Sequence, residues 1–394
     1  MKQSIAVGID IGTSQTRVVV CEAETASHTL PRVIGASVVP THGLRHGYII
    51  NKEEVVATLK RAVHEAQEDS GHRIRSASLA IGGIGLATEY AIGTAMVTRA
   101  DSVISKLDVD KAIAEAELKL ELKNKVILHA FPILFKVDGQ ELPTRPEGIS
   151  GFKLEVNVLF ITSFQQHVDD LLAVVAEAGV KVTSFTATPI AAEQLLLTEL
   201  QRNFGCALID IGAETTSVSV FENGSLTSLH VFGIGSLDIT KDIALGLRIT
   251  PEEAESIKMG VVGFHTVPKK KLDEIVEARL SDIFELIDKY FKKFGRSGLL
   301  PAGAIIIGGG AQVPSIETVA KNMLRIPAKV GFLEYPVAPS AGGTRTSKDQ
   351  RLLVAYGVAT STVDRVTGTH IRHSGSDGDG FLTTIKNFFK QLMP

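Results

Sequence analysis

Apolar and polar residues alternate in two distant stretches of the chain, and each stretch predicts a strand, a turn and a second strand. The first stretch spans residues 4–23. The second spans residues 206–224 and ends in Asn223-Gly224, which favours a hairpin turn. Both contain the same order of an acidic residue, an apolar residue, a glycine and small polar residues. This repetition predicts a duplicated α/β domain with a cleft between the two copies.

The turns of the two repeats contain residues suited to phosphate binding. Glycine lets the backbone approach a ligand closely, and successive N–H groups in a turn can form a nest for an anion. Two ordinary hairpins are the alternative, but two copies of the same polarity favour the phosphate site. The predicted phosphate-binding residues are Gly12, Thr13, Ser14 and Gln15 in the first turn and Gly212, Ala213, Glu214, Thr215 and Thr216 in the second.

One carboxylate precedes each turn, Asp10 in the first repeat and Asp210 in the second. Two carboxylates repel a polyphosphate and therefore cannot hold it directly. Mg²⁺ prefers oxygen ligands and keeps much of its shell of water. We therefore expect Asp10 and Asp210 to converge across the cleft and to associate with Mg²⁺ through water.

Two further segments could hold the rest of a nucleotide. A buried strand predicted over residues 304–307 runs into three glycines, against which a base or sugar could lie flat. A helix predicted to begin after Thr250 carries an acidic and a basic residue three positions apart on one face. An ordinary surface ion pair is equally consistent with that helix. The predicted adenosine-binding residues are Glu255, Lys258, Gly308, Gly309, Gly310 and Gln312.

Other patterned regions lie between and after the repeats. The segment between them predicts strands over residues 87–95, 125–137 and 154–161 and a helix near residues 110–121. Apolar residues at helical spacing predict one long amphipathic helix within residues 269–295, with lysines and arginines on its other faces.

The chain ends with an amphipathic segment after a polar stretch. Residues 364–380 predict a flexible linker, and Asp379 can cap a following helix. That helix is too short to span a bilayer, so we expect it to lie in the membrane interface. Docking onto the protein body is the alternative, which the polar tether disfavours. The predicted membrane-binding residues are Phe381, Leu382, Ile385, Phe388, Phe389 and Leu392.

Composition narrows the class of protein. The chain has 394 residues, 44% of them hydrophobic, which predicts two to three domains. A net charge of −3 gives no general reason to expect nucleic-acid binding. The N-terminal residues lack the apolar region of a signal peptide, and no apolar run reaches the roughly 20 residues of a membrane span. The histidines show no metal-binding pattern, and the two cysteines are expected to be packed thiols in a reducing cytoplasm.

Taken in order, these motifs resemble the actin/Hsp70/sugar-kinase superfamily, and the chain is most similar to the FtsA family of bacterial cell-division proteins. "DIGTSQTR" and "DIGAETTS" resemble the two phosphate loops, and "GGGAQ" resembles the adenosine loop. "GLRHGYIINKEEVVATLKRAVHEAQEDSG" and the glycine pattern at residues 146–151 resemble stretches specific to the FtsA family. The similarity runs from residue 4 to about residue 362 and returns in the tail.

The resemblance implies a duplicated actin/Hsp70-like (ribonuclease H-like) ATPase fold with a nucleotide cleft and a small inserted α+β subdomain. The expected division is subdomain IA over 1–83, continued by 164–190 and 355–363; subdomain IC over 84–163; subdomain IIA over 191–236, continued by 300–354; subdomain IIB over 237–299; a linker over 364–380; and a membrane-targeting helix over 381–394.

The resemblance also implies a function and its partners. A protein of this family would bind ATP with Mg²⁺, polymerise with itself and tether the tubulin-like FtsZ ring to the inner face of the cytoplasmic membrane. Subdomain IIB would receive the acidic C-terminal peptide of FtsZ, with Arg279 as the candidate contact. Subdomain IC would bind later division proteins, and the terminal helix would bind lipid. We expect a peripheral protein on the cytoplasmic face of the membrane at the division site.

One departure bears on catalysis. Related ATPases often carry a Glu or Gln that orients the attacking water, and here Thr188 stands at that position before Pro189. Glu193 follows five residues later on a different helix face. Loss of a general base typically costs about 10²–10⁴-fold in rate, so we expect ATP binding with slow or absent hydrolysis.

Two other readings remain. A PilM-type component of a type IV pilus machine would share the inserted subdomain, but the terminal amphipathic helix is not expected there. A sugar kinase or an Hsp70-type ATPase is disfavoured, because no acceptor-site signature and no long substrate domain after residue 360 are found.

Overall fold

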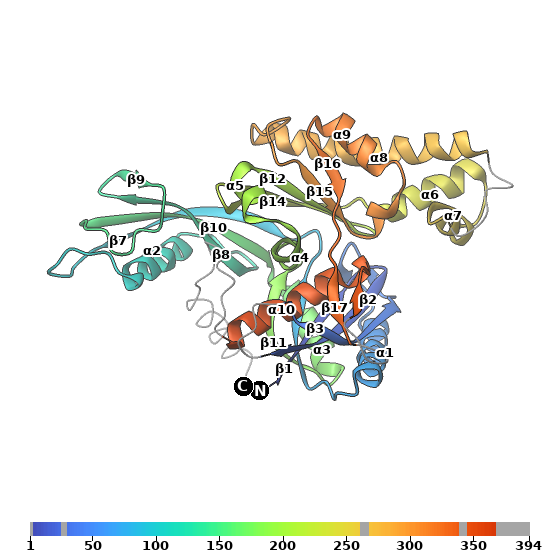
Figure 1. The fold of residues 1–394 in the computed structure, drawn as a ribbon, viewed down its shortest axis with the longest axis horizontal. Coiled ribbons are helices and arrows are strands. Elements are labelled where there is room, and N and C mark those ends of the chain that lie inside the picture. Colours follow the sequence, from blue (N-terminus) through green and yellow to red (C-terminus); the bar gives the residue numbers. More distant parts are fainter. Residues whose placement is uncertain (1–2, 25–29, 261–267, 339–344, 368–394) are drawn as a thin grey trace.

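Three large β-sheets organise the chain, and helices pack against each of them (Figure 1). The computed structural model describes residues 3–24, 30–260, 268–338 and 345–367. Within these ranges β4 (Leu44–Arg45) and β5 (Tyr48–Ile49) form an additional two-stranded sheet. No helix in the described residues is both long and apolar enough to cross a membrane. The predicted membrane-targeting helix and the linker beyond residue 367 lie outside the described residues.

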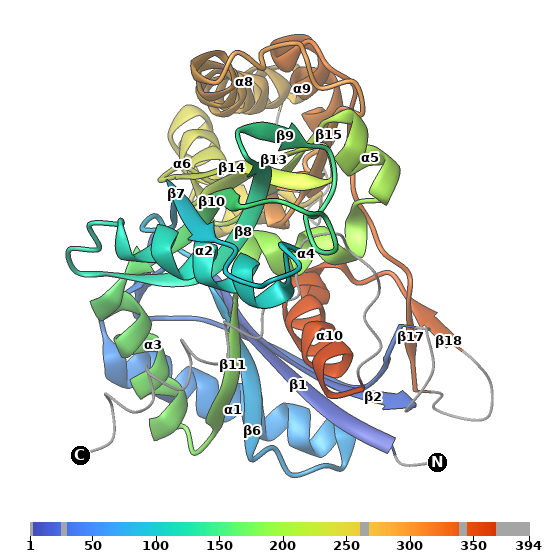
Figure 2. The same ribbon diagram turned by 90° about the vertical axis from the view of Figure 1, so that its left-hand side faces the viewer.

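The first sheet is covered by helices on both faces. Helices α1 (Lys52–Ser70) and α3 (Gln165–Glu177) lie on one face, and α10 (Leu353–Thr367) lies on the other (Figure 2). Its strand order is β11-β6-β1-β2-β3-β17-β18. The bounds are β1 Gln3–Ile11, β2 Gln15–Glu24, β3 Arg32–Pro40, β6 Ser76–Ile81, β11 Lys181–Ala187, β17 Tyr335–Val337 and β18 Arg345–Ser347.

Strand β1 shows how the alternating pattern produces two buried faces. Val7 and Ile9 belong to the core beneath α1, whereas Ala6 packs with residues of α10. Gly8 also faces α10, where a Cβ would lie 1.9 Å from the carbonyl oxygen of Ala355. Glycine is therefore required at residue 8 for the helix to pack this closely.

The inserted segment forms a separate four-stranded sheet with one helix. The strand order is β7-β10-β8-β9, with bounds β7 Ala87–Met96, β8 Lys125–Val137, β9 Gln140–Leu142 and β10 Lys153–Phe164. Helix α2 (Lys106–Leu118) packs so closely on β7 that a Cβ at Gly93 would lie 1.7 Å from the carbonyl oxygen of Ala112. The three strands predicted in this region are confirmed, and the helix begins and ends earlier than predicted.

The second large sheet has the order β14-β13-β12-β15-β16. Its strands are β12 Cys206–Ile211, β13 Thr216–Glu222, β14 Ser225–Phe232, β15 Ala304–Ile307 and β16 Ala328–Val330. The helices around it are α5 Glu199–Phe204, α6 Ser236–Leu247, α7 Pro251–Lys258, α8 Lys269–Lys293 and α9 Ile316–Leu324. Helix α8 confirms the predicted long amphipathic helix, because Leu280, Ile283 and Phe284 are fully buried in a core shared with Ile209.

The two large sheets repeat one arrangement. In the first, β1 pairs antiparallel with β2 and parallel with β6; in the second, β12 pairs antiparallel with β13 and parallel with β15. This repetition confirms the predicted duplicated α/β fold. The structure differs from the expected division at two points. Strands β17 and β18 extend the first sheet through β3, although residues 300–354 were assigned to the second half. Helix α10 continues to Thr367, so the first four residues of the linker predicted over 364–380 are helical. Helix α4 (Thr188–Leu196), which follows β11, packs on α10. The short 3-10 helix η3 (Gln350–Leu352) directly precedes α10.

Candidate nucleotide site

The two predicted phosphate turns have the same backbone geometry. The Gly12 N–H donates to the Gln15 carbonyl at 3.1 Å, and the Gly212 N–H donates to the Thr215 carbonyl at 2.8 Å. These two N–H groups close the turns, so the first N–H of each predicted nest is not available to a phosphate. Thr216 also differs from the prediction, because it is fully buried and its hydroxyl donates to the Ile234 carbonyl at 2.8 Å.

The two predicted metal-associated carboxylates lie within electrostatic reach of each other. Asp10 is 8% exposed, and Asp210 is partly buried. The pKa of Asp210 is raised to about 6, chiefly by burial and secondly by the negative charge of Asp10, while the positive charge of Arg17 opposes both effects. Arg17 is a site residue that the sequence reasoning missed, although its place in the hairpin, opposite Asp10, could have revealed it.

The three glycines after β15 have different environments. Gly308 has φ +89°, and a Cβ there would lie 2.3 Å from Asp210 Oδ1. A Cβ at Gly310 would lie 2.4 Å from the side chain of Ile211, whereas a Cβ at Gly309 would have no neighbour within 4 Å. Gly309 begins the short 3-10 helix η2 (Gly309–Gln312), which ends at the exposed Gln312. Two glycines thus fit the loop against β12, and Gly309 borders open space.

The predicted Glu255–Lys258 pair connects to the second phosphate turn. The carboxylate of Glu255 and the ammonium of Lys258 are 2.6 Å apart. The Lys258 ammonium also donates to the Ser236 carbonyl at 3.1 Å, and the Ser236 N–H donates to the Gly212 carbonyl at 2.8 Å. The side chain of Lys258 is only 2% exposed, whereas that of Glu255 is 44% exposed. Lys258 is therefore a buried residue that supports the second turn through Ser236, and Glu255 is the member of the pair that is exposed enough to reach a ligand.

The loop between β4 and β5 joins both turns, which the sequence did not reveal. The His46 N–H donates to a carboxylate oxygen of Glu214 at 2.6 Å, and the next N–H, of Gly47, donates to the Thr13 hydroxyl at 3.2 Å. Both donors have positive φ, +49° and +85°. Side chains of the two phosphate turns are thus fixed to consecutive residues of one loop.

The segment with Thr188 offers no carboxylate for activating water. Glu193 is buried and accepts a hydrogen bond from Arg202 Nη1 at 2.7 Å. Burial raises the pKa of Glu193, and the charge and hydrogen bond of Arg202 oppose that effect. Glu193 is therefore a structural ion-pair partner of Arg202.

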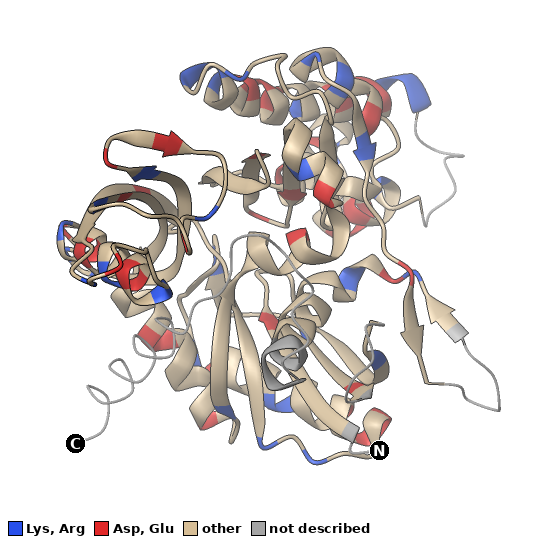
Figure 3. Ribbon diagram, turned by 60° about the vertical axis from the view of Figure 1, so that its left-hand side comes forward, with Lys and Arg blue, Asp and Glu red and all other residues tan. Residues whose placement is uncertain are grey.

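Charges on α8 are more mixed than the sequence interpretation implied. Basic residues gather near the two ends of the helix and acidic residues lie between them (Figure 3). Arg279 forms a two-point pair with Asp242, with distances of 2.6 and 3.1 Å, and lies 3.3 Å from Asp282. The hydrogen bonds that Arg279 donates to Asp242 raise the pKa of Arg279. An acidic peptide would have to compete with Asp242 for this guanidinium.

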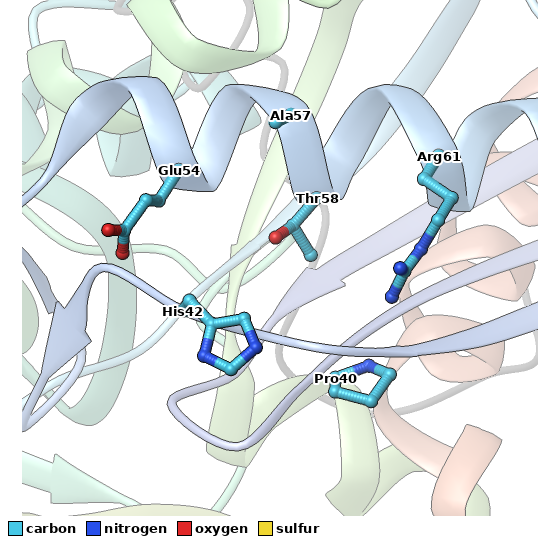
Figure 4. A pocket seen from close by; sticks show the side chains of 6 residues that line it. All are labelled: Pro40, His42, Glu54, Ala57, Thr58 and Arg61. Carbon is cyan, nitrogen blue, oxygen red and sulfur yellow. The ribbon is translucent and has the colours of Figure 1, made fainter.

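A separate hollow of about 550 Å³ lies beside α1 (Figure 4). Its lining residues are Pro40, His42, Glu54, Ala57, Thr58 and Arg61. The neighbouring Thr41 N–H donates to the Ser14 carbonyl at 2.9 Å, so the hollow adjoins the first turn. None of the predicted nucleotide-binding residues lines it.

Comparisons with known proteins identify the family. The family model "Cell division protein FtsA" matches residues 207–357, and "SHS2 domain inserted in FTSA" matches residues 87–162. Cell division protein FtsA of Bacillus subtilis (strain 168) is 31% identical over 350 residues, which cover 84% of this chain and 79% of that protein. The chain belongs to the FtsA family. Members from Pseudomonas aeruginosa (28% identical, covering 82% of each chain) and Escherichia coli K12 (25% identical, covering 84% of each) agree.

Solved structures show the same fold at low identity. A "PilM-PilN type IV pilus biogenesis complex" aligns with a TM-score of 0.65 at 18% identity, over 91% of this chain and 98% of the other. MreB5 of Spiroplasma citri bound to ADP aligns with a TM-score of 0.51 at 12% identity, over 93% and 98%. These likenesses confirm the actin-like fold, and the SHS2 match confirms that this FtsA-family chain carries the inserted domain.

Proposed function

We propose that this FtsA-family protein binds ATP with Mg²⁺ between its two halves, polymerises, and tethers the FtsZ ring to the inner face of the cytoplasmic membrane. The observation that supports the ATP site is the approach of the two matched turns, with Asp10 and Asp210 within electrostatic reach of each other and Gly308 beside Asp210. A fold neighbour of similar architecture, MreB5 of Spiroplasma citri, is described as bound to AMPPNP (TM-score 0.52, 13% identity, covering 94% of this chain and 99% of that one).

The donor set fits Mg²⁺ held mainly by the nucleotide. Among the described residues there is no group of three or more His, Cys, Asp or Glu side chains able to hold a metal. A metal beside Asp10 and Asp210 would therefore take most of its ligands from phosphates and water, as Mg²⁺ commonly does. When bound, Mg²⁺ supplies neutralisation of the phosphate charge.

The protein's own residues divide the remaining work. Backbone N–H groups beyond Gly12 and Gly212 face the phosphates, Gly309 receives the adenosine, and Glu255 binds ribose. The start of α4 carries Thr188 and Pro189 in place of a carboxylate, and Glu193 is held by Arg202, so none of these residues acts as a general base. Hydrolysis is therefore slow or absent in this proposal.

The proposed binding surfaces for partner proteins follow from charged and exposed residues of subdomains IIB and IC. The acidic C-terminal peptide of FtsZ would dock on subdomain IIB, near Arg279 and the basic ends of α8. Later division proteins would bind subdomain IC, where the outermost strand β7 exposes Ile92 and Met96. A second copy of the chain would extend the filament.

Membrane attachment rests on the terminal segment, argued from sequence. Its seven apolar side chains, which are the six predicted membrane-binding residues and Met393, would contribute about 1.5–2 kcal/mol each on burial. Ordering about 13 residues costs on the order of 1 kcal/mol each, so one tail binds weakly. A filament that presents many tails would bind firmly, because linked sites rebind at high effective concentration.

Electron microscopy on anionic lipid monolayers tests the proposal. The full chain with ATP should form membrane-bound filaments, and a chain that ends at residue 378 should not attach. Asp210→Asn should weaken ATP binding and remove filaments, whereas Phe389→Glu should leave ATP binding intact and abolish attachment. Full attachment by Phe389→Glu would refute the anchor, and fast ATP cleavage in a single turnover would refute slow hydrolysis.

A further inference from the structure

The guanidinium of Arg17 binds one of the two proposed metal-associated carboxylates. Arg17 Nη1 lies 2.9 Å from Asp10 Oδ2, and the two side chains are only 19% and 11% exposed. The pairing follows from register, because Asp10 and Arg17 are direct partners on β1 and β2. A charge-assisted hydrogen bond of this kind engages the carboxylate oxygen that a metal ion or its bound water would use.

Gln15 holds the guanidinium on this side of the turn. Arg17 Nη2 donates to Gln15 Oε1 at 3.2 Å, and Nη1 lies 3.4 Å from the Gln15 carbonyl oxygen. A Cβ at Gly12 would lie 3.1 Å from Nη1, so glycine leaves room for the guanidinium. Arg17 Nε is buried and has no hydrogen-bond partner among the described residues, which leaves one donor for a further acceptor.

The charge of Arg17 acts on both carboxylates, and the second repeat has no equivalent of it. The cross-strand partner of Asp210 is Ser217, which carries no charge. Arg17 nevertheless opposes the rise in the pKa of Asp210. It also acts on Asp349, but that carboxylate is bound by Arg351 at 2.7 Å. The guanidinium of Arg17 therefore pairs with Asp10 and also acts electrostatically on Asp210.

We propose that Arg17 and a divalent cation compete for Asp10, so that metal enters with the nucleotide and not before it. Arg17 engages Asp10 Oδ2 and repels an approaching cation. A polyphosphate offers the guanidinium several acceptor oxygens in place of one carboxylate, and its planar fork suits them. Nucleotide binding thus draws Arg17 away and frees Asp10 for the metal. This inference rests on the proposed ATP site and makes Arg17 a positioning residue for the metal.

The test titrates the full-length, nucleotide-free protein with Mn²⁺ and follows the electron paramagnetic resonance signal of free Mn²⁺. Arg17→Gln should bind Mn²⁺ about tenfold more tightly than the wild type, equivalent to about 1.4 kcal/mol at 25 °C. The same variant should bind ATP in EDTA more weakly. Arg17→Lys, which keeps the charge, should stay close to the wild type in the Mn²⁺ titration, and adding Asp10→Asn to Arg17→Gln should abolish the gain.

Arg32→Gln is the matched control. Arg32 pairs with Glu22 across β2 and β3 at an exposed position outside the site, so its loss should change neither Mn²⁺ nor ATP binding. Circular dichroism checks the fold of each variant. Should Arg17→Gln not fold, Gln15→Ala, which releases the guanidinium, should tighten Mn²⁺ binding by a smaller factor.

The outcomes separate this inference from the proposed function. If Arg17→Gln binds Mn²⁺ no more tightly than the wild type, the proposed competition is refuted. General damage to the site would weaken the binding of Mn²⁺ and of ATP together, whereas competition predicts tighter Mn²⁺ binding and weaker ATP binding. A wild-type protein that binds no ATP, with or without Mg²⁺, refutes the proposed ATP site. In that case the Mn²⁺ comparison still decides whether Arg17 competes for Asp10.

Discussion

Replacing Gly308 by alanine should damage the fold and the site together, whereas the same change at Gly309 should damage only ligand binding. Gly308 has φ +89° and ψ 176°, a region that is nearly exclusive to glycine. Alanine there costs about 1–3 kcal/mol in backbone strain alone. Its Cβ would also lie 2.3 Å from Asp210 Oδ1 and 2.5 Å from the Ile211 carbonyl oxygen, so β12 or the loop must move.

Gly309 is the matched control because it is the next residue and receives the same methyl group. A Cβ there has no neighbour within 4 Å, and alanine in place of glycine reduces the entropy of the unfolded chain. We expect Gly309→Ala to keep or slightly raise the midpoint of thermal unfolding, and to weaken ATP binding if adenosine lies against this residue.

Thermal unfolding followed by circular dichroism measures the difference. A loss of 1 kcal/mol lowers the midpoint by roughly 2–4 °C in domains of 150–250 residues. Gly308→Ala should therefore unfold several degrees below Gly309→Ala, and it should also bind ATP more weakly because Asp210 is displaced. Equal midpoints for the two variants would refute the close approach of the loop to β12.

Three further predictions concern ionisable side chains that are buried or half-buried. Glu193→Gln should lower the free energy of unfolding by about 3–5 kcal/mol, because it leaves Arg202 without its carboxylate; denaturant titration measures this, and the hydrolysis rate per bound ATP should stay unchanged. Burial lowers the pKa of His167, so its contribution to stability is fully present above the ordinary histidine pKa of about 6.5 and is lost as the pH falls through the lower pKa of the folded state. His167→Gln should therefore reduce the loss of stability between pH 7 and pH 5, which thermal unfolding measured at several pH values would show. Asp242→Asn should free Arg279 and tighten binding of an acidic FtsZ C-terminal peptide in fluorescence anisotropy, and Arg279→Ala should cancel the gain.

Local patterns predicted the parts of the fold that depend on neighbouring residues. The alternation around Asp10 and Asp210 marked both hairpins, and helical spacing marked α8, because one face of each element must be buried. Sheet membership of β17 was not predictable in this way. Its three residues, Tyr335–Val337, join β3 only after a long excursion through the second half.

The candidate site shows the same limit more sharply. The residues of the turns were found from sequence, but their contacts were not. Glu214 meets His46 across 168 positions of sequence, and Lys258 meets Ser236 only after two helices have packed. Arg17 was within reach of sequence reasoning, since the hairpin register alone places it opposite Asp10.

The two turns have the same backbone conformation but opposite side-chain charges, so the two sides of the site differ in charge. The first turn has Ser14 and the cation Arg17, whereas the second has Glu214 and the uncharged Ser217 at the matching positions. If both turns carried a cation, the carboxylate pair would be neutralised and a metal would gain little; if neither did, Asp10 and Asp210 would repel each other and the phosphates without compensation. One cation on one turn leaves a net negative charge on the carboxylate pair, which a divalent metal ion would neutralise. Duplication therefore accounts for the geometry of the site, and divergence between the copies accounts for its chemistry.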